Sequence, residues 1–289
     1  MTRKFAIVGA GTVGSALSRL LVQAGYEFIG AASRSPKSAA AACRFAGAGR
    51  PTTNPSEVTL EADLVFLTTA DDIIRRVCGD LASAGGFRDR AVVAHCSGAL
   101  PSTILENARQ RGASIGSMHP LQTFATAEQA VEMLPGSYCC IEGDSEAVKI
   151  LADAARAMRM KVLTIPTHAK PLYHAAAAVA SNYLVVLENA ALKLGEAAGI
   201  SRTDALNAFL PLIKGTVANL EQTGIPQSLT GPIARGDVQT VRRHLEAIAA
   251  GAPGLVALYK ALGREAVDIA IAKGTLGAGQ AEELLAILQ

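Results

Sequence analysis

The sequence predicts an α/β protein, with a doubly wound, mostly parallel sheet over residues 1–166 and an all-helical second domain over residues 167–289. Up to Ile165, short apolar runs alternate with helical patterns, which is typical of a parallel sheet covered by helices on both faces. After Pro166, glycine and proline separate successive helical patterns, and no convincing strand is present. A chain of 289 residues, 50% of them hydrophobic, is long and apolar enough to form two cores.

Each predicted strand is a short apolar run that ends in a polar or glycine-rich turn. The strand candidates are Phe5–Val8, Phe28–Ala32, Leu64–Leu67, Val92–Ala94, Ala113–Met118, Tyr138–Ile141 and Val162–Ile165. The first helix is expected over Gly14–Ala24, because Gly25 is suited to the left-handed conformation that ends a helix. Residues 34–50 are rich in Ala, Ser and Gly, and we expect them to form a loop and a surface helix.

Charge and aromatic content argue against nucleic-acid binding. Lys+Arg 27 against Asp+Glu 25 leaves a formal net charge of +2, and the chain has no Trp. Such a protein has neither the basic field nor the stacking platforms that nucleic acids require. The 5 cysteines are an odd number and form no CxxC pair. We therefore expect no metal site, no disulfide framework and a reducing compartment.

Two stretches imitate membrane signals. The N-terminal stretch has a basic tip and an apolar run, but three glycines interrupt the run and Arg19 follows it. Pro171–Leu187 is apolar apart from His174, Ser181 and Asn182, and is shorter than the ~20 residues that span a bilayer. We therefore expect a cytoplasmic protein without a membrane partner.

A glycine-rich turn follows the first predicted strand. Its residues are Gly9, Ala10, Gly11, Thr12, Val13 and Gly14, with the spacing GxGxxG between a strand and a helix. The first glycine permits the tight turn, the second lets the backbone approach a pyrophosphate, and the third lets helix and strand pack closely. The helix N-terminus at Thr12 and Val13 offers free N–H groups to phosphate oxygens. This context predicts a Rossmann dinucleotide-binding domain; the alternative is a glycine turn without a ligand.

The end of the second strand indicates which dinucleotide binds. In this fold an acidic residue there binds the ribose of NAD, whereas an arginine accommodates the 2′-phosphate of NADP. This chain has no acid at that position but has Ser33, Arg34 and Ser35, whose guanidinium and hydroxyl groups suit a phosphate. NADP is therefore the predicted cofactor, and an exposed polar turn is the alternative interpretation.

A second loop at the same sheet edge follows Leu64–Leu67. The predicted neighbours of the cofactor ribose and nicotinamide in this loop are Thr68, Thr69 and Ala70. Asp71 is a further candidate neighbour of the cofactor, but Asp71 or Asp72 is equally suited to capping the helix that starts near Ile73.

Two polar segments further along each follow an apolar strand, where ligands bind in open α/β sheets. A neutral His119 can exchange the proton that accompanies hydride transfer near pH 7, and Ser97 can orient it. The alternative for His119 is a hydrogen-bonded structural histidine. His95 is expected to be structural, and Cys96 to line the nicotinamide rather than act as a nucleophile.

A narrow polar stripe marks the first helix of the second domain. Lys170, His174, Ser181 and Glu188 fall within roughly 40° of one another at helical spacing, and Asn182 lies beside them. Such a stripe either faces water or lines a cleft, and its place directly after the nucleotide domain favours a substrate cleft.

A second glycine-rich turn precedes a later helix of this domain. Arg235 could there contact an anionic substrate, whereas Asp237 is suited to capping the helix.

Four longer segments carry a resemblance to a known family. They are HCSGAL at residues 95–100, SMHPLQTF at 117–124, KPLYHAAAAVASNYL at 170–184 and TGPIARGD at 230–237. Over essentially its whole length, the chain resembles bacterial Rossmann-like NADP oxidoreductases with a C-terminal helical domain of unknown function. The wider group includes deazaflavin-dependent NADP oxidoreductases, pyrroline-5-carboxylate reductase, prephenate dehydrogenase and the β-hydroxyacid dehydrogenases. The resemblance also implies a helical domain similar to the C-terminal domain of 6-phosphogluconate dehydrogenase.

The resemblance implies roles for four residues. Ser97 and His119 are similar in position to the catalytic Ser and His-Pro of prephenate dehydrogenases. Lys170 and His174 are similar in placement to the Lys and the next-turn polar residue of β-hydroxyacid dehydrogenases. However, Pro120 is followed by Leu-Gln-Thr rather than glycine, and His174 stands where the β-hydroxyacid enzymes have Asn. The substrates of those families are therefore not carried over.

Together these features predict an NADP-dependent oxidoreductase that transfers a hydride between nicotinamide and a small polar carbonyl or alcohol substrate. The carbonyl/alcohol couple is favoured because His and Lys donors suit an alkoxide. A cyclic-imine reductase and a non-catalytic NADP(H)-sensing protein stay open as alternatives. We also expect a homodimer built largely by the helical domain, because the small side chains of Ala175–Ala180 permit close helix approach.

Overall fold

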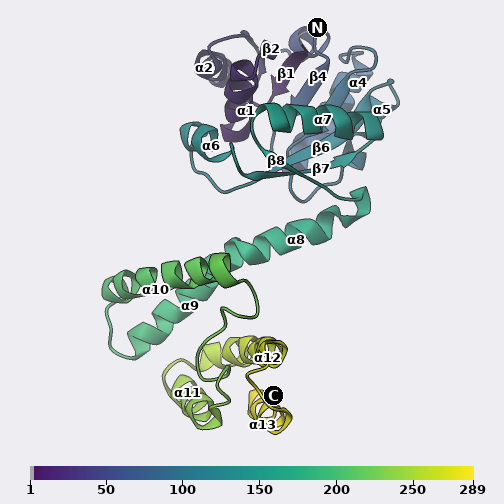
Figure 1. Ribbon diagram of the computed structural model, residues 1–289. Helices are drawn as coiled ribbons and strands as arrows, with labels where there is room; N and C mark the ends of the chain where they lie inside the picture. The colour runs from purple at the N-terminus through teal and green to yellow at the C-terminus, as the bar shows by residue number, and fades with distance from the viewer. Residues whose placement is uncertain (1–2) are drawn as a thin grey trace. The chain divides into compact units, whose positions relative to one another are not determined.

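An eight-stranded sheet organises the first part of the chain in the computed structural model, which describes residues 3–289 (Figure 1). Its strand order is β3-β2-β1-β4-β5-β6-β7-β8. The strands are β1 (Lys4–Val8), β2 (Glu27–Ala32), β3 (Arg50–Thr52), β4 (Leu64–Leu67), β5 (Val92–His95), β6 (Ser114–Leu121), β7 (Tyr138–Gly143) and β8 (Lys161–Thr164). Every neighbouring pair is parallel except β6 and β7, which are antiparallel. The predicted strands are confirmed, and the structure adds β3.

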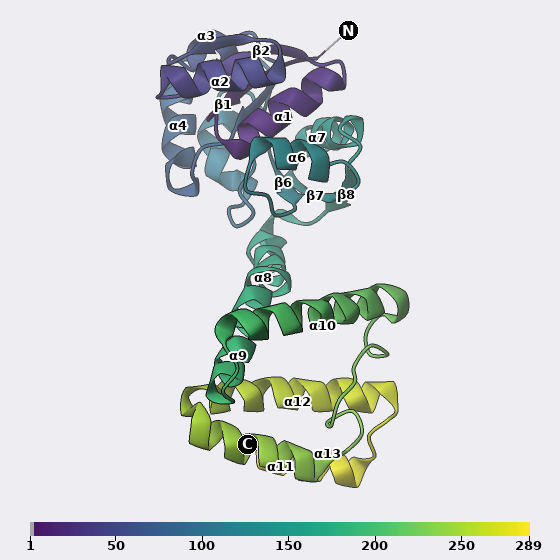
Figure 2. The ribbon, with the colours of Figure 1, turned by 90° about the vertical axis from the view of Figure 1, so that its left-hand side faces the viewer.

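Helices cover both faces of this sheet, which confirms the doubly wound prediction (Figure 1, Figure 2). One face is packed by α1 (Thr12–Gln23), α2 (Pro36–Ala46), α6 (Ala127–Met133) and α7 (Ser145–Ala157), through a core that includes Leu17 and Leu151. The other face is packed by α3 (Ser56–Thr59), α4 (Asp71–Ser83), the 3-10 turn η1 (Ser102–Leu105) and α5 (Glu106–Arg109), around Ile74 and Leu105. The strand order reverses between β1 and β4, and ligands of open α/β sheets bind in the crevice outside the carboxyl ends there.

The apolar runs of the strands follow from this double cover. In β4, Leu64 and Phe66 belong to the first core, whereas Val65 and Leu67 belong to the second. All four side chains are completely buried, because successive strand residues point to opposite faces and both faces are packed.

The helix ends follow the expected local chemistry. Gly25 follows α1 with a φ of +86°, so it provides the left-handed exit that was predicted. The loop and surface helix expected over residues 34–50 are present: α2 begins at Pro36 after Ser35 and ends at Ala46, and β3 begins at Arg50.

β6 is longer than its neighbour β5. The parallel β5–β6 ladder ends where His95 pairs with Ser117, whereas the antiparallel β6–β7 ladder continues to Leu121. His119 therefore lies on a part of β6 that has passed the end of β5 and is still held by β7 through its pairing with Cys140.

The chain divides into two compact units between Val179 and Ala180, beyond the boundary expected after Pro166. The 3-10 turn η2 (Thr167–Ala169) and nearly all of α8 (Lys170–Ala180) belong to the first unit. The physical reason is that the start of α8 is anchored in that unit, where the side chain of Lys170 is fully buried.

The second unit is all-helical over its whole length, as predicted. Its helices are α9 (Asn182–Ala197), α10 (Arg202–Thr223), α11 (Val238–Gly251), α12 (Val256–Lys273) and α13 (Ala278–Leu288), with a 3-10 turn η3 (Pro253–Leu255). α11, α12 and α13 pack around a core that includes Val241, Val267 and Leu284 (Figure 2). α9 and α10 pack against each other but bury few side chains: Ala205 is the one buried residue of the 22 in α10.

Large apolar side chains are exposed along α9 and α10. Val185 is 72% and Leu212 69% exposed. One helical stretch, Thr167–Ala197, is long and apolar enough by length and composition to cross a membrane, which is a longer stretch than the Pro171–Leu187 run suggested. Only 6% of its most apolar window is buried within the chain. Exposed apolar surfaces of this extent are typical of interaction sites.

Candidate dinucleotide site and active site

The glycine turn joins β1 to α1 at the point where the strand order reverses. Gly9 has a φ of +112°, and a Cβ there would lie 2.6 Å from the carbonyl carbon of Thr68. A Cβ on Gly14 would lie 2.3 Å from the carbonyl oxygen of Gly9. The tight packing of the turn against β4 and α1 therefore requires both glycines.

Gly11 has a different environment. A Cβ there would meet nothing within 4 Å, so the turn leaves space at the residue that lets a pyrophosphate approach. Gly11 is the N-cap of α1, and within residues 3–289 no side chain caps this helix end and no acid lies in its first turn. The N–H groups at Thr12 and Val13 are thus suited to an anion.

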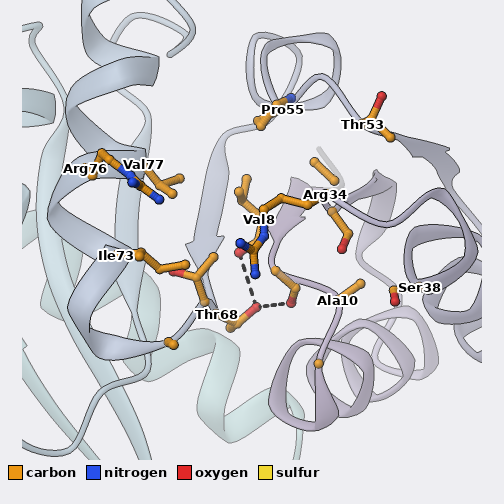
Figure 3. A pocket seen from close by; sticks show the side chains of 16 residues that line it. Val8, Ala10, Arg34, Ser38, Thr53, Pro55, Thr68, Ile73, Arg76 and Val77 are labelled. Atoms are coloured by element: carbon orange, nitrogen blue, oxygen red, sulfur yellow. Dashed lines mark hydrogen bonds between the residues drawn. The ribbon is translucent and has the colours of Figure 1, made fainter.

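A cavity of about 340 Å³ lies beside this turn. Its wall consists of Val8, Gly9, Ala10, Gly11, Ala32, Ser33, Arg34, Ser38, Thr53, Pro55, Thr68, Thr69, Ala70, Ile73, Arg76 and Val77. Figure 3 shows Arg34, from the β2–α2 connection, and Arg76, from α4, on opposite sides of the cavity. Among these lining residues, none is acidic, so the two guanidinium groups give the cavity a positive wall.

The serines that flank Arg34 have different partners. Ser33 lines the cavity, and its Oγ accepts a hydrogen bond from the N–H of Ser35 at 3.4 Å. Ser35 is the N-cap of α2, where its Oγ accepts from the N–H of Ser38 at 3.2 Å. Ser38, rather than the predicted Ser35, supplies the second hydroxyl at the cavity wall.

The three residues predicted after β4 all line the cavity. Thr68 donates from Oγ1 to the carbonyl oxygen of Gly9 at 2.6 Å, which ties the loop to the glycine turn (Figure 3). Within residues 3–289, the Thr69 hydroxyl is buried without a hydrogen-bond partner. An unpaired buried hydroxyl is costly, and the space, N–H groups and cations around it fit a dinucleotide that would pair with it.

Ser97 follows β5 and is hydrogen-bonded to Asp71. Its Oγ donates to Asp71 Oδ2 at 2.7 Å and accepts from the N–H groups of Ala99 and Leu100 at 3.2 and 3.1 Å. Asp71 is therefore a partner of Ser97 in the first turn of α4, whose N-cap is Ala70. Because its hydroxyl proton is committed to Asp71, Ser97 does not orient His119 in the way that the sequence suggested.

His119 is oriented instead by Tyr173, from α8. The imidazole Nδ1 lies 2.9 Å from the phenol oxygen, and the two rings meet edge to face with centroids 5.8 Å apart. The opposite nitrogen, Nε2, lies next to Gly98, where a Cβ would be 2.8 Å from it. That Cβ would also be 2.5 Å from Cδ2 of His174, so glycine is required between the two imidazoles.

The two imidazoles share one small region of the first unit. The ring centroids of His119 and His174 are 6.2 Å apart. Burial, then the charge of Lys170 and the neighbouring His174, lower the pKa of His119 to about 4, against a small opposing effect of Asp71. His119 is therefore neutral at physiological pH, as the proposed proton relay requires.

Lys170 is enclosed in the first unit. Its side chain is fully buried, and Nζ donates to Ser117 Oγ at 2.6 Å and lies 5.7 Å from the ring centroid of Tyr173. Burial lowers the pKa of Lys170, and the nearby Cys140 and Glu142 oppose that shift. The predicted catalytic lysine is thus held by Ser117, and its charge contributes to the lowered pKa of His119.

His95 and Cys96 end β5. His95 is fully buried, and its Nδ1 accepts from the N–H of Ser97 at 3.1 Å, whereas within residues 3–289 its Nε2 is buried without a hydrogen-bond partner. The structural role of His95 stays a prediction. Burial raises the pKa of Cys96 to about 12, so its thiol is protonated and is no nucleophile. All five thiols are free, and no cluster of metal-binding side chains lies within residues 3–289.

The predicted substrate contacts lie in the second unit. Ser181 precedes α9 and breaks the continuous helix on which the polar stripe was predicted, and Asn182 is the first residue of α9. Arg235 is exposed before α11, and Asp237 caps that helix by accepting from the N–H of Thr240 at 3.0 Å. The capping role is confirmed, and the substrate contacts of Ser181, Asn182 and Arg235 stay predictions.

Besides Ser38, two residues of the candidate site were missing from the sequence predictions, Arg76 and Tyr173. Arg76 lies on the cavity side of α4, and the Asp71–Ser83 pattern gives no signal that separates it from Arg75. Tyr173 is one turn from Lys170 and adjacent to His174, but it lies beside the narrow polar stripe rather than on it.

Two family models match the chain. Residues 2–120 match a Rossmann-like domain, and residues 137–266 match a domain of unknown function, DUF2520. No curated protein shows a significant sequence match.

Solved structures share the whole architecture. Protein TM1727 from Thermotoga maritima is 26% identical, with a TM-score of 0.73, over 93% of this chain and 99% of that chain. BF3122 from Bacteroides fragilis, described as a candidate NADP oxidoreductase, is 23% identical, with a TM-score of 0.71, over 92% of this chain and 98% of its own. A pyrroline-5-carboxylate reductase from Coxiella burnetii is 16% identical, with a TM-score of 0.62, over 98% and 99%. The likenesses below 25% identity establish the fold.

Proposed function

This chain belongs to the proteins that join a Rossmann-like domain to a DUF2520 domain, and from that premise we propose that it is an NADP-dependent oxidoreductase. The proposed reaction is hydride transfer between the nicotinamide and a small polar carbonyl or alcohol. The observation that carries the proposal is the cavity beside the glycine turn, with Arg34 and Arg76 in its wall and no acidic residue among its lining. The names of the solved neighbours, an NADP oxidoreductase candidate and a pyrroline-5-carboxylate reductase, are in keeping with it.

The cofactor contacts follow from the cavity. The N–H groups after Gly11 would hold the pyrophosphate, and Arg34, with Ser33 and Ser38, would hold the 2′-phosphate. Arg76 would add a second guanidinium from the facing helix.

The chemistry needs a donor at the reacting oxygen. When bound, the nicotinamide supplies or accepts the hydride. In carbonyl reduction, Nε2–H of His119, which lies toward Gly98, would donate its proton to the alkoxide oxygen as the hydride arrives. Nδ1 would take up the phenol proton of Tyr173 in the same step, and a proton from solvent would restore the phenol. Ser97 keeps the β5 turn in place through Asp71, and burial, with a further effect of the Lys170 charge, lowers the pKa of His119 and keeps it neutral.

Cofactor choice provides the first test. NADP(H) should bind at least about ten times more tightly than NAD(H), because a charge-assisted contact to the 2′-phosphate contributes roughly 1.5–3 kcal/mol. Arg34→Ala and Arg76→Ala should each lose much of that preference in calorimetric titrations. Arg75→Ala, on the same helix but outside the cavity wall, is the matched control and should retain it. Equal dissociation constants of wild type for the two cofactors would reject NADP specificity.

Turnover provides the second test. NADPH oxidation is followed at about 340 nm over keto acids, aldehydes and cyclic imines, and a keto acid or aldehyde should react. His119→Gln should lower the turnover ~10²–10⁴-fold with little change in cofactor affinity, as is usual for general acid–base groups. Reaction with cyclic imines alone would replace the carbonyl proposal by an imine reductase. Tight NADPH binding without turnover of any class would indicate an NADP(H)-sensing protein.

We further propose that a second copy of this chain covers α9 and α10. α10 has 22 residues and buries one, and Tyr183, Val185 and Leu212 are each more than 60% exposed. A helix pair that exposes large apolar side chains in this number is typical of a protein–protein interface. A membrane is the competing partner, but Lys170 and Tyr173, at the start of the 167–197 stretch, are engaged with side chains of the first unit.

Light scattering should give about twice the chain mass of 29.8 kDa at micromolar concentration without detergent. Leu212→Asp should shift the protein toward the monomer, whereas Glu221→Asp, on the same helix, should not. A monomer that remains soluble, or co-flotation of the wild type with lipid vesicles, would reject the dimer.

A further inference from the structure

We propose that Tyr173 is a positioning residue that holds neutral His119 in the tautomer with its proton on Nε2, so that the candidate active site offers a hydrogen-bond donor to the substrate. The proposal deepens the function above, on which its statement about the substrate rests. Its statement about the tautomer rests on the structure of the first unit alone.

The phenol oxygen of Tyr173 lies 2.9 Å from Nδ1 of His119, and either group could donate the hydrogen bond between them. Burial raises the pKa of Tyr173, so the phenol keeps its proton. Burial and the charge of Lys170 lower the pKa of His119, so its imidazole is neutral and carries a single N–H. A neutral imidazole has one donor and one acceptor nitrogen, and the partner of one nitrogen fixes the other. If the phenol donates to Nδ1, the imidazole proton must be on Nε2.

The two neighbours of the Tyr173 hydroxyl make the phenol the donor toward His119. Its other neighbour is the buried thiol of Cys140, whose pKa burial raises, so the thiol keeps its own proton. A thiol sulfur is a weak acceptor, whereas an imidazole nitrogen is a strong one. The phenol O–H is therefore best placed to donate to Nδ1, which accepts the hydrogen bond and stays unprotonated.

The opposite ring nitrogen of His119, Nε2, is the one that would meet the substrate. Nε2 lies next to Gly98, which has no side chain that could accept its proton. The titratable groups nearby are Lys170, Asp71 and the imidazoles of His174 and His95. Asp71 is already paired with Ser97, and within residues 3–289 no hydrogen bond joins His119 to either imidazole. A substrate atom with a lone pair, such as a carbonyl oxygen, would accept from Nε2–H. A protonated iminium nitrogen has no lone pair and would be disfavoured there, so the tautomer selects carbonyl over iminium.

The tautomer can be measured without a substrate. The nitrogen chemical shifts of ¹⁵N-histidine-labelled full-length protein distinguish a protonated from an unprotonated ring nitrogen, and His119→Gln identifies the signals of His119. In wild type at neutral pH, Nε2 of His119 should be protonated and Nδ1 should not. In Tyr173→Phe the two signals should move toward a mixture of tautomers.

The chain contains a matched control. Tyr259 and His244, in the second unit, have the same arrangement, with the phenol oxygen 2.8 Å from Nδ1 and the rings edge to face at 5.9 Å. Tyr259→Phe should alter the His244 signals and leave those of His119 unchanged. Protonated Nδ1 in wild-type His119, or signals that Tyr173→Phe leaves unchanged, would overturn the proposal.

Kinetic measurements complete the test, because they separate the tautomer of His119 from the proposed reaction. Tyr173→Phe should lower kcat for a carbonyl substrate roughly 10-fold and leave KM for NADPH unchanged, because a misplaced proton affects the chemical step. The expected tautomer together with iminium-only turnover would overturn the substrate clause. The expected tautomer in a protein without turnover would reject the proposed function and leave the tautomer assignment intact.

Discussion

Mild acid should destabilise this protein through two buried histidines. Burial and the charge of Lys170 lower the pKa values of His95 and His119 to about 4, from an ordinary value of 6.5. The unfolded chain therefore binds protons that the folded chain does not. The stabilisation is complete above pH 6.5 and is lost as the pH falls from 6.5 through 4.

The magnitude follows from the size of the shift. One pKa unit corresponds to about 1.4 kcal/mol, so at about pH 5 each histidine should lower the free energy of unfolding by up to about 2 kcal/mol relative to pH 8. The assay is urea unfolding of wild type and His119→Gln at both pH values. His119→Gln has no imidazole to protonate at this position, so its loss of stability between the two pH values should be smaller by about the amount for one histidine. An equal loss in the two proteins would refute the reasoning, whatever their absolute stabilities.

Three further outcomes follow from the glycine turn and from the thiol of Cys96, a half-buried residue. Gly11→Ala should change the free energy of unfolding by no more than about 1 kcal/mol, because a Cβ there has open space, but should weaken NADPH binding; unchanged affinity by calorimetry would contradict the pyrophosphate role. Gly14→Ala should destabilise the fold by roughly 1–3 kcal/mol, because its Cβ would lie 2.3 Å from a carbonyl oxygen, and a melting temperature equal to wild type would be inconsistent with this packing. Cys96 should react slowly with iodoacetamide near pH 8, because burial raises the pKa of its thiol to about 12, and rapid labelling in peptide mass spectra would contradict that environment.

The sheet could be predicted from the sequence wherever a strand is buried on both faces. Leu64–Leu67 is a continuous apolar run, and its predicted bounds are those of β4. β3 (Arg50–Thr52) could not be predicted in this way, because it is a three-residue edge strand with a central proline and exposed side chains. The reversed direction of β7 also has no local signal, since it depends on how the chain crosses the sheet.

The site was predicted in part, and the limits are physical. The strand-end rule located Ser97 and His119, because side chains after parallel strands gather at one sheet edge. Their hydrogen-bond partners, Asp71 and Tyr173, come from helices distant in sequence, so pairing depends on tertiary packing that residue spacing does not encode. The same holds for Lys170: its place on the polar helix face suggested a cleft, but the folded chain buries the side chain against Ser117.

The pairing of β6 with β5 is shorter than its pairing with β7, and this difference has a consequence for motion at the candidate active site. His119 lies past the last β5 partner of β6, yet its backbone remains paired with Cys140 of β7. Its amide should therefore exchange with solvent at the slow rate of the central sheet, whereas the amides of the Ala99–Leu100 turn should exchange faster. His119, the proposed acid–base group, thus lies on a rigid strand, and adaptation to different substrates would fall to the loops around it, with the orientation of the imidazole kept.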